Sequence, residues 1–140
     1  MSEDDLRTFL VLPDTMIASD AGPRRFGDAV PHPRGYGNNA RLLGRYVRDL
    51  KLLSLEEGVR KMTSLPARTF RLKNRGELRN GFVADLVLFD PAQVDDPSKF
   101  DDPHHYAKGF TDVIVNGVPV IREGAVTPAR PGRPVRLKDE

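Results

Sequence analysis

Apolar residues follow a helical period at the start of the chain and then give way to a short continuous apolar run. Between Ser2, a typical helix cap, and Pro13, the apolar positions fall on one helical face: Leu6, Phe9 and Leu10. The next segment, residues 15–20, is β-prone and almost fully apolar until it ends in polar residues. It is predicted to be a buried parallel strand that carries the carboxylate of Asp20 at its C-terminal end.

Two longer amphipathic helices are predicted between residues 37 and 63. The first follows a Pro/Gly-rich loop over residues 21–37, and its apolar face comprises Leu42, Leu43, Tyr46, Val47 and Leu50. The second begins at a capping box formed by Ser54 and Glu57 and extends to about Met62. Residues 63–68 have the pattern of a further short helix, since proline is tolerated in a first helical turn.

The pattern changes from helical to extended near residue 75. Residues 82–90 form an apolar run between glycine and proline, which predicts a strand. Residues 112–122 contain two β-prone runs separated by Asn116-Gly117, the dipeptide favoured in two-residue hairpin turns. Residues 91–110 are polar and are predicted to be irregular. The expected fold class is α+β, with a helical first half and a β second half.

Composition and charge describe a soluble globular chain. Of the 140 residues, 39% are hydrophobic and 30% are charged, with 22 basic residues against 20 acidic ones. The chain is too short for a complete (β/α)8 barrel of about 250 residues. Its basic, proline-rich end is expected to be a solvated tail that binds no nucleic acid, although it contains Arg130, Arg133, Arg136 and Lys138. No apolar run is long enough to span a membrane and none resembles a signal peptide, so a cytoplasmic location is expected.

Three residues in or next to the loop of residues 21–37 are candidates for a functional site. Asp20 follows a predicted buried strand, and enzymes with parallel sheets place catalytic groups at such strand ends; capping of the next turn is the structural alternative. His32 lies between two prolines that hold it extended, and Arg34 carries a planar fork suited to a substrate carboxylate. Either of these two residues could instead anchor the loop.

Other ionisable residues are predicted to be structural. His104 and His105 are adjacent in a polar segment and are expected at the surface, while Asp85 and Asp90 flank a strand and are expected to form strand-end hydrogen bonds. The chain contains no cysteine, no His-x-His pair and no phosphate-binding or nucleophile-elbow motif.

Several segments, taken in order, resemble the C-terminal part of the N-acyl-D-amino-acid deacylases (D-aminoacylases) of the amidohydrolase superfamily. The Ala-Asp-Leu-Val strand is general to the superfamily, whereas the series Ser-Asp, His-Pro-Arg and Met-Thr-x-Leu-Pro-Ala is more specific. Ala21 stands where the family usually has glycine. The segments are Met16–Asp20, His32–Arg34, Leu53–Glu57, Lys61–Ala67, Ala84–Asp90, Val113–Gly117 and Arg130–Arg133.

The resemblance implies a fold that this chain only partly contains. Residues 1–75 would supply the last strand and helices of a metal-bearing (β/α)8 barrel. Residues 76–127 would supply C-terminal strands of a small β-sandwich, including the hairpin 112–122, and residues 128–140 would form the tail. The missing N-terminal barrel half, or a full-length homologue, is the implied partner.

The resemblance also implies a reaction, in which a zinc enzyme hydrolyses N-acyl-D-amino acids to a carboxylate and a D-amino acid. Asp20 would touch the metal and act as general base on the hydrolytic water, whose pKa the metal lowers. Arg34 would meet the substrate carboxylate, with His32 beside it. Because one carboxylate cannot hold catalytic zinc, the isolated chain is expected to be inactive and to bind no metal tightly. The alternative is a non-enzymatic interaction or regulatory module that pairs with a full-length homologue.

Overall fold

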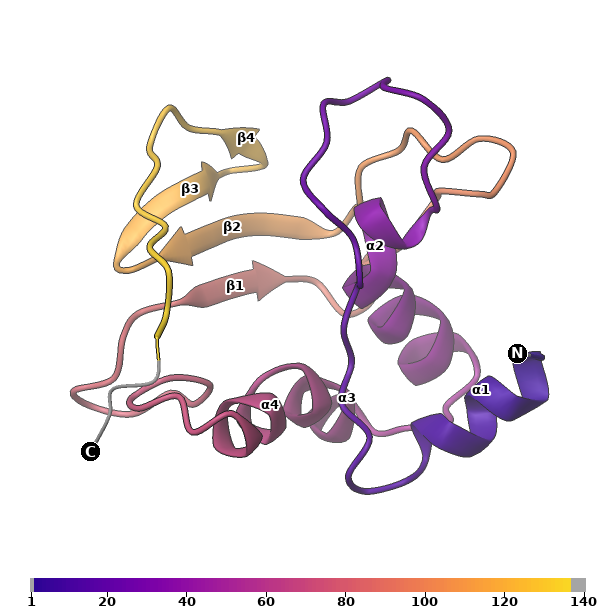
Figure 1. Ribbon diagram of the computed structural model, residues 1–140, viewed down its shortest axis with the longest axis horizontal. Coiled ribbons are helices and arrows are strands. Elements are labelled where there is room, and N and C mark those ends of the chain that lie inside the picture. Colours follow the sequence, from indigo (N-terminus) through magenta and orange to yellow (C-terminus); the bar gives the residue numbers. More distant parts are fainter. Residues whose placement is uncertain (1, 137–140) are drawn as a thin grey trace.

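The computed structural model describes residues 2–136, in which a group of helices precedes a small antiparallel sheet (Figure 1). The helical segments are α1 (Glu3–Leu10), α2 (Arg34–Arg41), the π-helical segment η1 (Leu42–Asp49), α3 (Leu55–Met62) and α4 (Ser64–Thr69). The strands are β1 (Leu86–Phe89), β2 (Phe110–Val115), β3 (Val118–Arg122) and β4 (Ala125–Val126). The predicted change from helices to strands near residue 75 is confirmed.

Side-chain caps fix where two of the helices begin. Ser2 accepts a hydrogen bond from the backbone N–H of Asp5, and the Asp5 carboxylate accepts one from the N–H of Ser2, so α1 starts with a complete capping box. At α3 the Ser54 hydroxyl accepts from the N–H of Glu57, while the Glu57 carboxylate turns instead to Arg60. Both predicted helix starts are confirmed, and so is the short helix α4.

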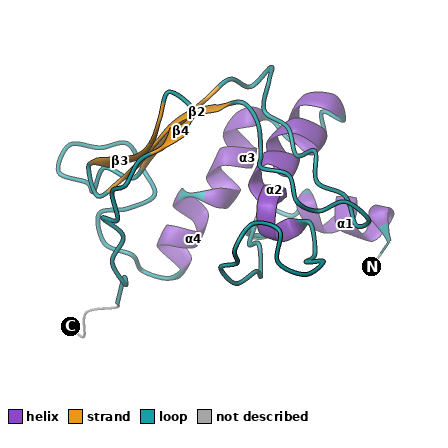
Figure 2. Ribbon diagram, turned by 90° about the horizontal axis from the view of Figure 1, so that it is seen from above, coloured by secondary structure: helices purple, strands orange, loops and turns teal. Residues whose placement is uncertain are grey.

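Helices α2 and η1 run continuously and separate two groups of buried side chains. One group joins α1 to η1 through Leu10, Leu42, Tyr46 and Leu53. The other joins the same helix to the segment between β1 and β2 through Ala40, Leu43 and Val94. In the predicted apolar face, Leu42, Leu43 and Tyr46 are therefore buried, Val47 is partly buried and Leu50, at the end, is 41% exposed. Seen from above, the sheet lies to one side of the helices, and α1 lies at the end of the molecule away from β3 (Figure 2).

The sheet has the strand order β1-β2-β3-β4, and each neighbouring pair is antiparallel. Strands β2 and β3 meet at a turn in which Asn116 and Gly117 have φ angles of 49° and 79°. Two consecutive positive φ values define the tight hairpin turn that Asn-Gly favours. The predicted hairpin is confirmed.

The predicted buried parallel strand over residues 15–20 is wrong for this chain. The segment is irregular and partly buried; Thr15 N–H donates to the carbonyl of Leu12 at 3.3 Å and Ile17 N–H to the carbonyl of Lys61 at 3.2 Å. A parallel strand needs neighbouring strands to take up its N–H and C=O groups, and the sheet within residues 2–136 contains only β1 to β4. Asp20 then leaves the extended region with a φ of 47°.

The strand predicted for residues 82–90 is shorter than expected, because only Leu86–Phe89 pairs with β2. Just before it, the side chain of Asp85 accepts from the Asn116 N–H at 2.8 Å and pairs with Arg75, which replaces ladder hydrogen bonds.

The chain after β4 is not simply solvated, because the carbonyl of Pro131 accepts a hydrogen bond from the Asn116 side chain at 2.8 Å. Lys138, part of the predicted tail, lies outside the described residues. None of the helices described here is long and apolar enough to cross a bilayer.

Candidate functional site

Asp20, His32 and Arg34, which the sequence singled out, line one cavity of about 710 Å³. Its walls come from α1, from the start of α2 and from residues 96–101, which lie far apart in the sequence. Tyr46 and Arg41 contribute to the wall formed by the continuous helix α2–η1. The fold thus gathers the three candidates without the predicted strand.

Asp20 and Arg34 form an ion pair at this cavity. The Arg34 Nη2 group donates to Asp20 Oδ2 at 2.7 Å, and the side chains are 41% and 84% exposed for Arg34 and Asp20 respectively. The remaining N–H groups of the guanidinium fork can still face another anion, since arginine carries five donors. The pair therefore joins a proton acceptor to an anion-binding group at the surface of the cavity.

His32 lies at the start of α2 and has a structural contact there. Its Nδ1 accepts a hydrogen bond from the backbone N–H of Arg34 at 3.1 Å, which satisfies a donor that a helix start leaves unpaired. The ring also meets Phe100 edge-on, with centroids 4.9 Å apart. These contacts anchor the loop end, the alternative that the sequence left open for His32, and a role toward substrate stays a prediction.

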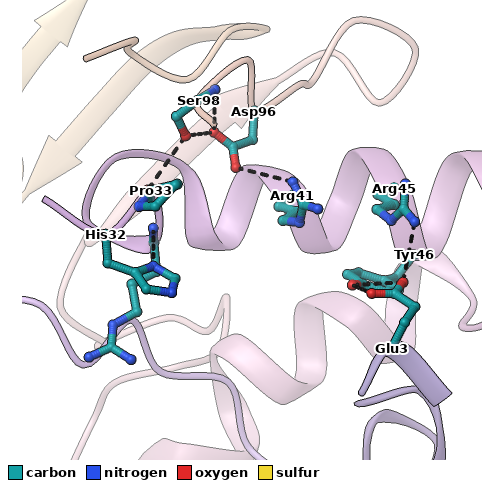
Figure 3. A network of polar contacts seen from close by, with 9 residues as sticks. Glu3, His32, Pro33, Arg41, Arg45, Tyr46, Asp96 and Ser98 are labelled. Atoms are coloured by element: carbon teal, nitrogen blue, oxygen red, sulfur yellow. Dashed lines mark hydrogen bonds and ion pairs between the residues drawn. The ribbon is translucent and has the colours of Figure 1, made fainter. Parts of the chain in front are cut away.

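A buried carboxylate that the sequence analysis missed supports the back of the cavity (Figure 3). The Asp96 side chain is 2% exposed, lies 3.9 Å from Arg41 and accepts hydrogen bonds from the N–H and hydroxyl of Ser98. A Cβ atom on Gly37 would overlap this carboxylate, so glycine makes room for it. The Asp-x-Ser spacing is a local turn signal, but nothing local in the sequence indicates that α2 covers it.

A second polar contact joins α1 to η1 at the other side of the cavity (Figure 3). Glu3 accepts from the Tyr46 hydroxyl at 3.2 Å and from Arg45 Nη2 at 3.3 Å. The hydrogen bond to Glu3 raises the pKa of Arg45 above its ordinary value, so this guanidinium stays charged. The contact holds the first helix against the cavity wall.

The described residues do not make a complete metal site. Within residues 2–136 no group of three or more His, Cys, Asp or Glu side chains is arranged to hold a metal ion. Asp20 is paired with a cation and is mostly exposed, whereas catalytic zinc needs three protein ligands. Asp20 can supply one ligand at most, so residues 2–136 by themselves do not fit a catalytic metal.

The other ionisable candidates are structural, as predicted, with one exception. Asp90 accepts from the N–H of Ala92 at 2.8 Å and caps a turn after β1. His105 pairs with Asp102 at 2.7 Å. His104, expected at the surface, is half-buried, and its ring contacts the backbone of the loop that precedes His32. No local pattern in the sequence indicates this long-range contact.

Comparison with known proteins places the chain in a family. The protein-family model described as "Amidohydrolase family" matches residues 7–121, which is most of the chain. This chain belongs to the amidohydrolase family. Among curated proteins, D-aminoacylase of Alcaligenes xylosoxydans xylosoxydans is 47% identical over 133 residues, which cover 95% of this chain and 27% of that protein. N-acyl-D-glutamate deacylase of the same organism is 44% identical over 136 residues, covering 97% of this chain and 27% of the relative.

Solved structures give the same relationship. A crystal structure of D-aminoacylase is 44% identical with a TM-score of 0.86, over 92% of this amidohydrolase chain and 27% of the solved one. N-acyl-D-glutamate deacylase from Bordetella bronchiseptica, complexed with zinc and a phosphonate inhibitor, is 42% identical with a TM-score of 0.81, over 92% and 28% of the two chains. The resemblance to the deacylases is confirmed, and the chain spans about a quarter of their length.

Proposed function

We propose that this chain is the C-terminal part of a metal-dependent deacylase that hydrolyses N-acyl-D-amino acids. The observation that carries the proposal is the Asp20–Arg34 pair at one cavity, in a chain 47% identical to a D-aminoacylase over 95% of its length. The relatives named here act, by their names, on N-acyl-D-amino acids. The function belongs to the assembled enzyme, and the isolated chain is inactive.

Asp20 is the proposed general base of this reaction. It accepts a proton from the attacking water as the oxygen bonds to the amide carbonyl carbon. It then returns the proton to the nitrogen when the C–N bond breaks, which yields a carboxylate and a free amine. Arg34 binds the α-carboxylate through the part of its fork that Asp20 leaves open. His32 completes the substrate side of the cavity.

The rest of the site must come from outside the described residues. Zinc is the proposed metal, since a related deacylase was solved with zinc; Asp20 contributes one contact to it, and other segments supply the remaining ligands. Residues 1–75 are proposed to complete a (β/α)8 barrel, residues 76–127 to belong to a small β-sandwich, and residues 128–140 to form a tail.

Exposed apolar side chains support a need for the missing barrel portion. Phe9 and Leu12, which precede residues 15–20, are 51% and 46% exposed, and Val87 and Leu88 are 51% and 49% exposed on the edge strand β1. Edge strands with open, apolar side chains are surfaces that a partner normally covers. The proposed partner is the segment that corresponds to the unmatched part of D-aminoacylase.

Complementation tests the proposal. The chain is mixed with the portion of D-aminoacylase that it does not match, zinc is added, and release of D-leucine or D-glutamate from the N-acetyl compounds is measured. The L-enantiomers serve as substrate controls. We expect turnover only when both parts are present, and Asp20→Asn should lower kcat by about 10²- to 10⁴-fold, the usual contribution of a general base.

Asp101→Asn is the matched control, because Asp101 lines the same cavity and carries the same charge. It should change kcat less than about threefold. Equal losses in the two variants would contradict the role of Asp20. Tight association of the two parts without turnover that depends on Asp20 would instead favour the non-enzymatic interaction module.

A further inference from the structure

The loop of residues 21–31 joins the two halves of the candidate site. Asp20 precedes it and His32 follows it, yet the loop contains no helix or strand and most of its residues are exposed. A loop of this kind has many conformations unless other segments hold it. The polar segment between β1 and β2 runs beside it in space (Figure 1), and His104 of that segment makes hydrogen bonds to the loop.

Both ring nitrogens of His104 contact the loop. Nε2 lies 2.8 Å from the carbonyl oxygen of Ala29, and Nδ1 lies 3.2 Å from the backbone N–H of Gly27. A carbonyl can only accept and an N–H can only donate, so the backbone requires the neutral ring with its proton on Nε2. Both loop contacts are then satisfied by a single tautomer.

The same ring also reaches the helix that carries Arg34. The Tyr36 hydroxyl lies 2.8 Å from His104 Nδ1, and Tyr36 follows Arg34 by two residues in α2. The rings of Phe26 and Tyr106 close the group, with centroids 4.8 Å apart, and Phe26 also meets Tyr36 edge-on at 5.9 Å. One histidine therefore joins the loop, the start of α2 and the segment between β1 and β2.

We propose that His104 is a positioning residue that fixes the loop 21–31 and so sets the distance between Asp20 and Arg34. Its importance for catalysis rests on the function proposed above. The loop contacts themselves exist in this chain without any partner, so the holding role is testable independently of turnover.

Limited trypsin digestion measures how often the loop opens. Arg24 and Arg25 are exposed within the loop, and cleavage of a fast-opening segment follows the population of its open form. The rate of cutting after these two residues is followed by mass spectrometry for the wild type and for His104→Ala. Loss of two hydrogen bonds to the loop should raise this rate about tenfold, which corresponds to about 1.4 kcal/mol in the opening equilibrium.

His105→Ala is the matched control, since the neighbouring histidine contacts Asp102 and not the loop. Trypsin should cut the loop of this variant at the wild-type rate. His104→Asn keeps an acceptor near the position of Nδ1 but loses the donor at Nε2, so it should give an intermediate rate. Far-UV circular dichroism checks that each variant is folded. Equal cutting rates in folded His104→Ala and wild type would overturn the proposal.

Kinetics of the complemented enzyme separate positioning from general stability. Because the ring holds the end of the loop nearest Arg34, His104→Ala should raise KM for the N-acyl-D-amino acid about tenfold while kcat changes less than threefold. A variant that only lost folded protein would lower the apparent kcat and leave KM unchanged, and that result would count against positioning. If no mixture turns over, the proposed function fails, and the digestion still decides whether His104 holds the loop.

Discussion

Replacement of Lys61 by methionine tests how the segment before Asp20, residues 12–19, is held in place. Lys61 lies in α3 and its side chain is fully buried. Its ammonium group donates to the carbonyls of Leu12 and Thr15, the latter at 3.3 Å, and lies 3.5 Å from a carboxylate oxygen of Glu57. Lys61 therefore fixes the position of the segment that leads to Asp20.

The expected loss of stability follows from the groups that methionine leaves unpaired. Methionine is similar in length and apolar volume, so little cavity forms. The carbonyl of Thr15 loses its donor, and an unsatisfied buried acceptor costs about 1–3 kcal/mol, whereas the carbonyl of Leu12 keeps the N–H of Thr15 as a donor at 3.3 Å. Removal of the lysine charge from the interior offsets part of this loss. We expect Lys61→Met to lower the free energy of unfolding by about 1–3 kcal/mol.

Urea unfolding followed by far-UV circular dichroism measures this difference, since the chain has no tryptophan. Lys73→Met is the matched control, because Lys73 is exposed, and it should change the free energy of unfolding by less than about 0.5 kcal/mol. A Lys61→Met variant as stable as this control would refute the argument, since the hydrogen bonds to the segment would then add nothing.

Two further substitutions test the packing behind the cavity and an ion pair in α3. Gly37→Ala should destabilise the chain by about 1–3 kcal/mol in the same unfolding assay, because its Cβ overlaps buried Asp96, whereas Gly22→Ala, in open space, should be nearly neutral. Arg60 lowers the pKa of Glu57 from 4.5 to about 2, so the charged pair stabilises the fold above pH 4.5 and is lost as the pH falls toward 2. Glu57→Gln should therefore be about 1 kcal/mol less stable than wild type at pH 7, and the difference should vanish near pH 2; a constant difference would contradict the assignment.

Features of the fold that depend on local signals could be predicted from the sequence. The side chains of Ser2 and Ser54 each accept a hydrogen bond from the backbone N–H three residues later. Each cap and the helix start that it stabilises therefore lie within one turn of chain. Asn116 and Gly117 adopt the positive φ angles that a two-residue hairpin needs, which sets the pairing of β2 with β3. In these segments the interaction partners are sequence neighbours.

Features that depend on distant partners were missed or wrongly predicted. The apolar run at residues 15–20 has the composition of a buried strand, but no neighbouring strand within the described residues completes its hydrogen bonds. Asp96, Lys61 and His104 read as ordinary polar residues in the sequence, and each acquires its role from a segment tens of positions away. Such long-range contacts cannot be predicted from residue composition or from the spacing of residues along the chain.

The position of Asp20 shows how the site is built when its strand is absent. On the N-terminal side, Lys61 holds the chain up to Thr15; on the C-terminal side, His104 holds the loop that leads to Arg34. The ion pair between Asp20 and Arg34 links the two ends of the loop 21–31, although Asp20 itself is mostly exposed to water. A general base acts best where water is excluded and its partners are fixed. The chain fixes the partners, and under the proposed function exclusion of water is therefore the contribution expected from the segments that complete the enzyme.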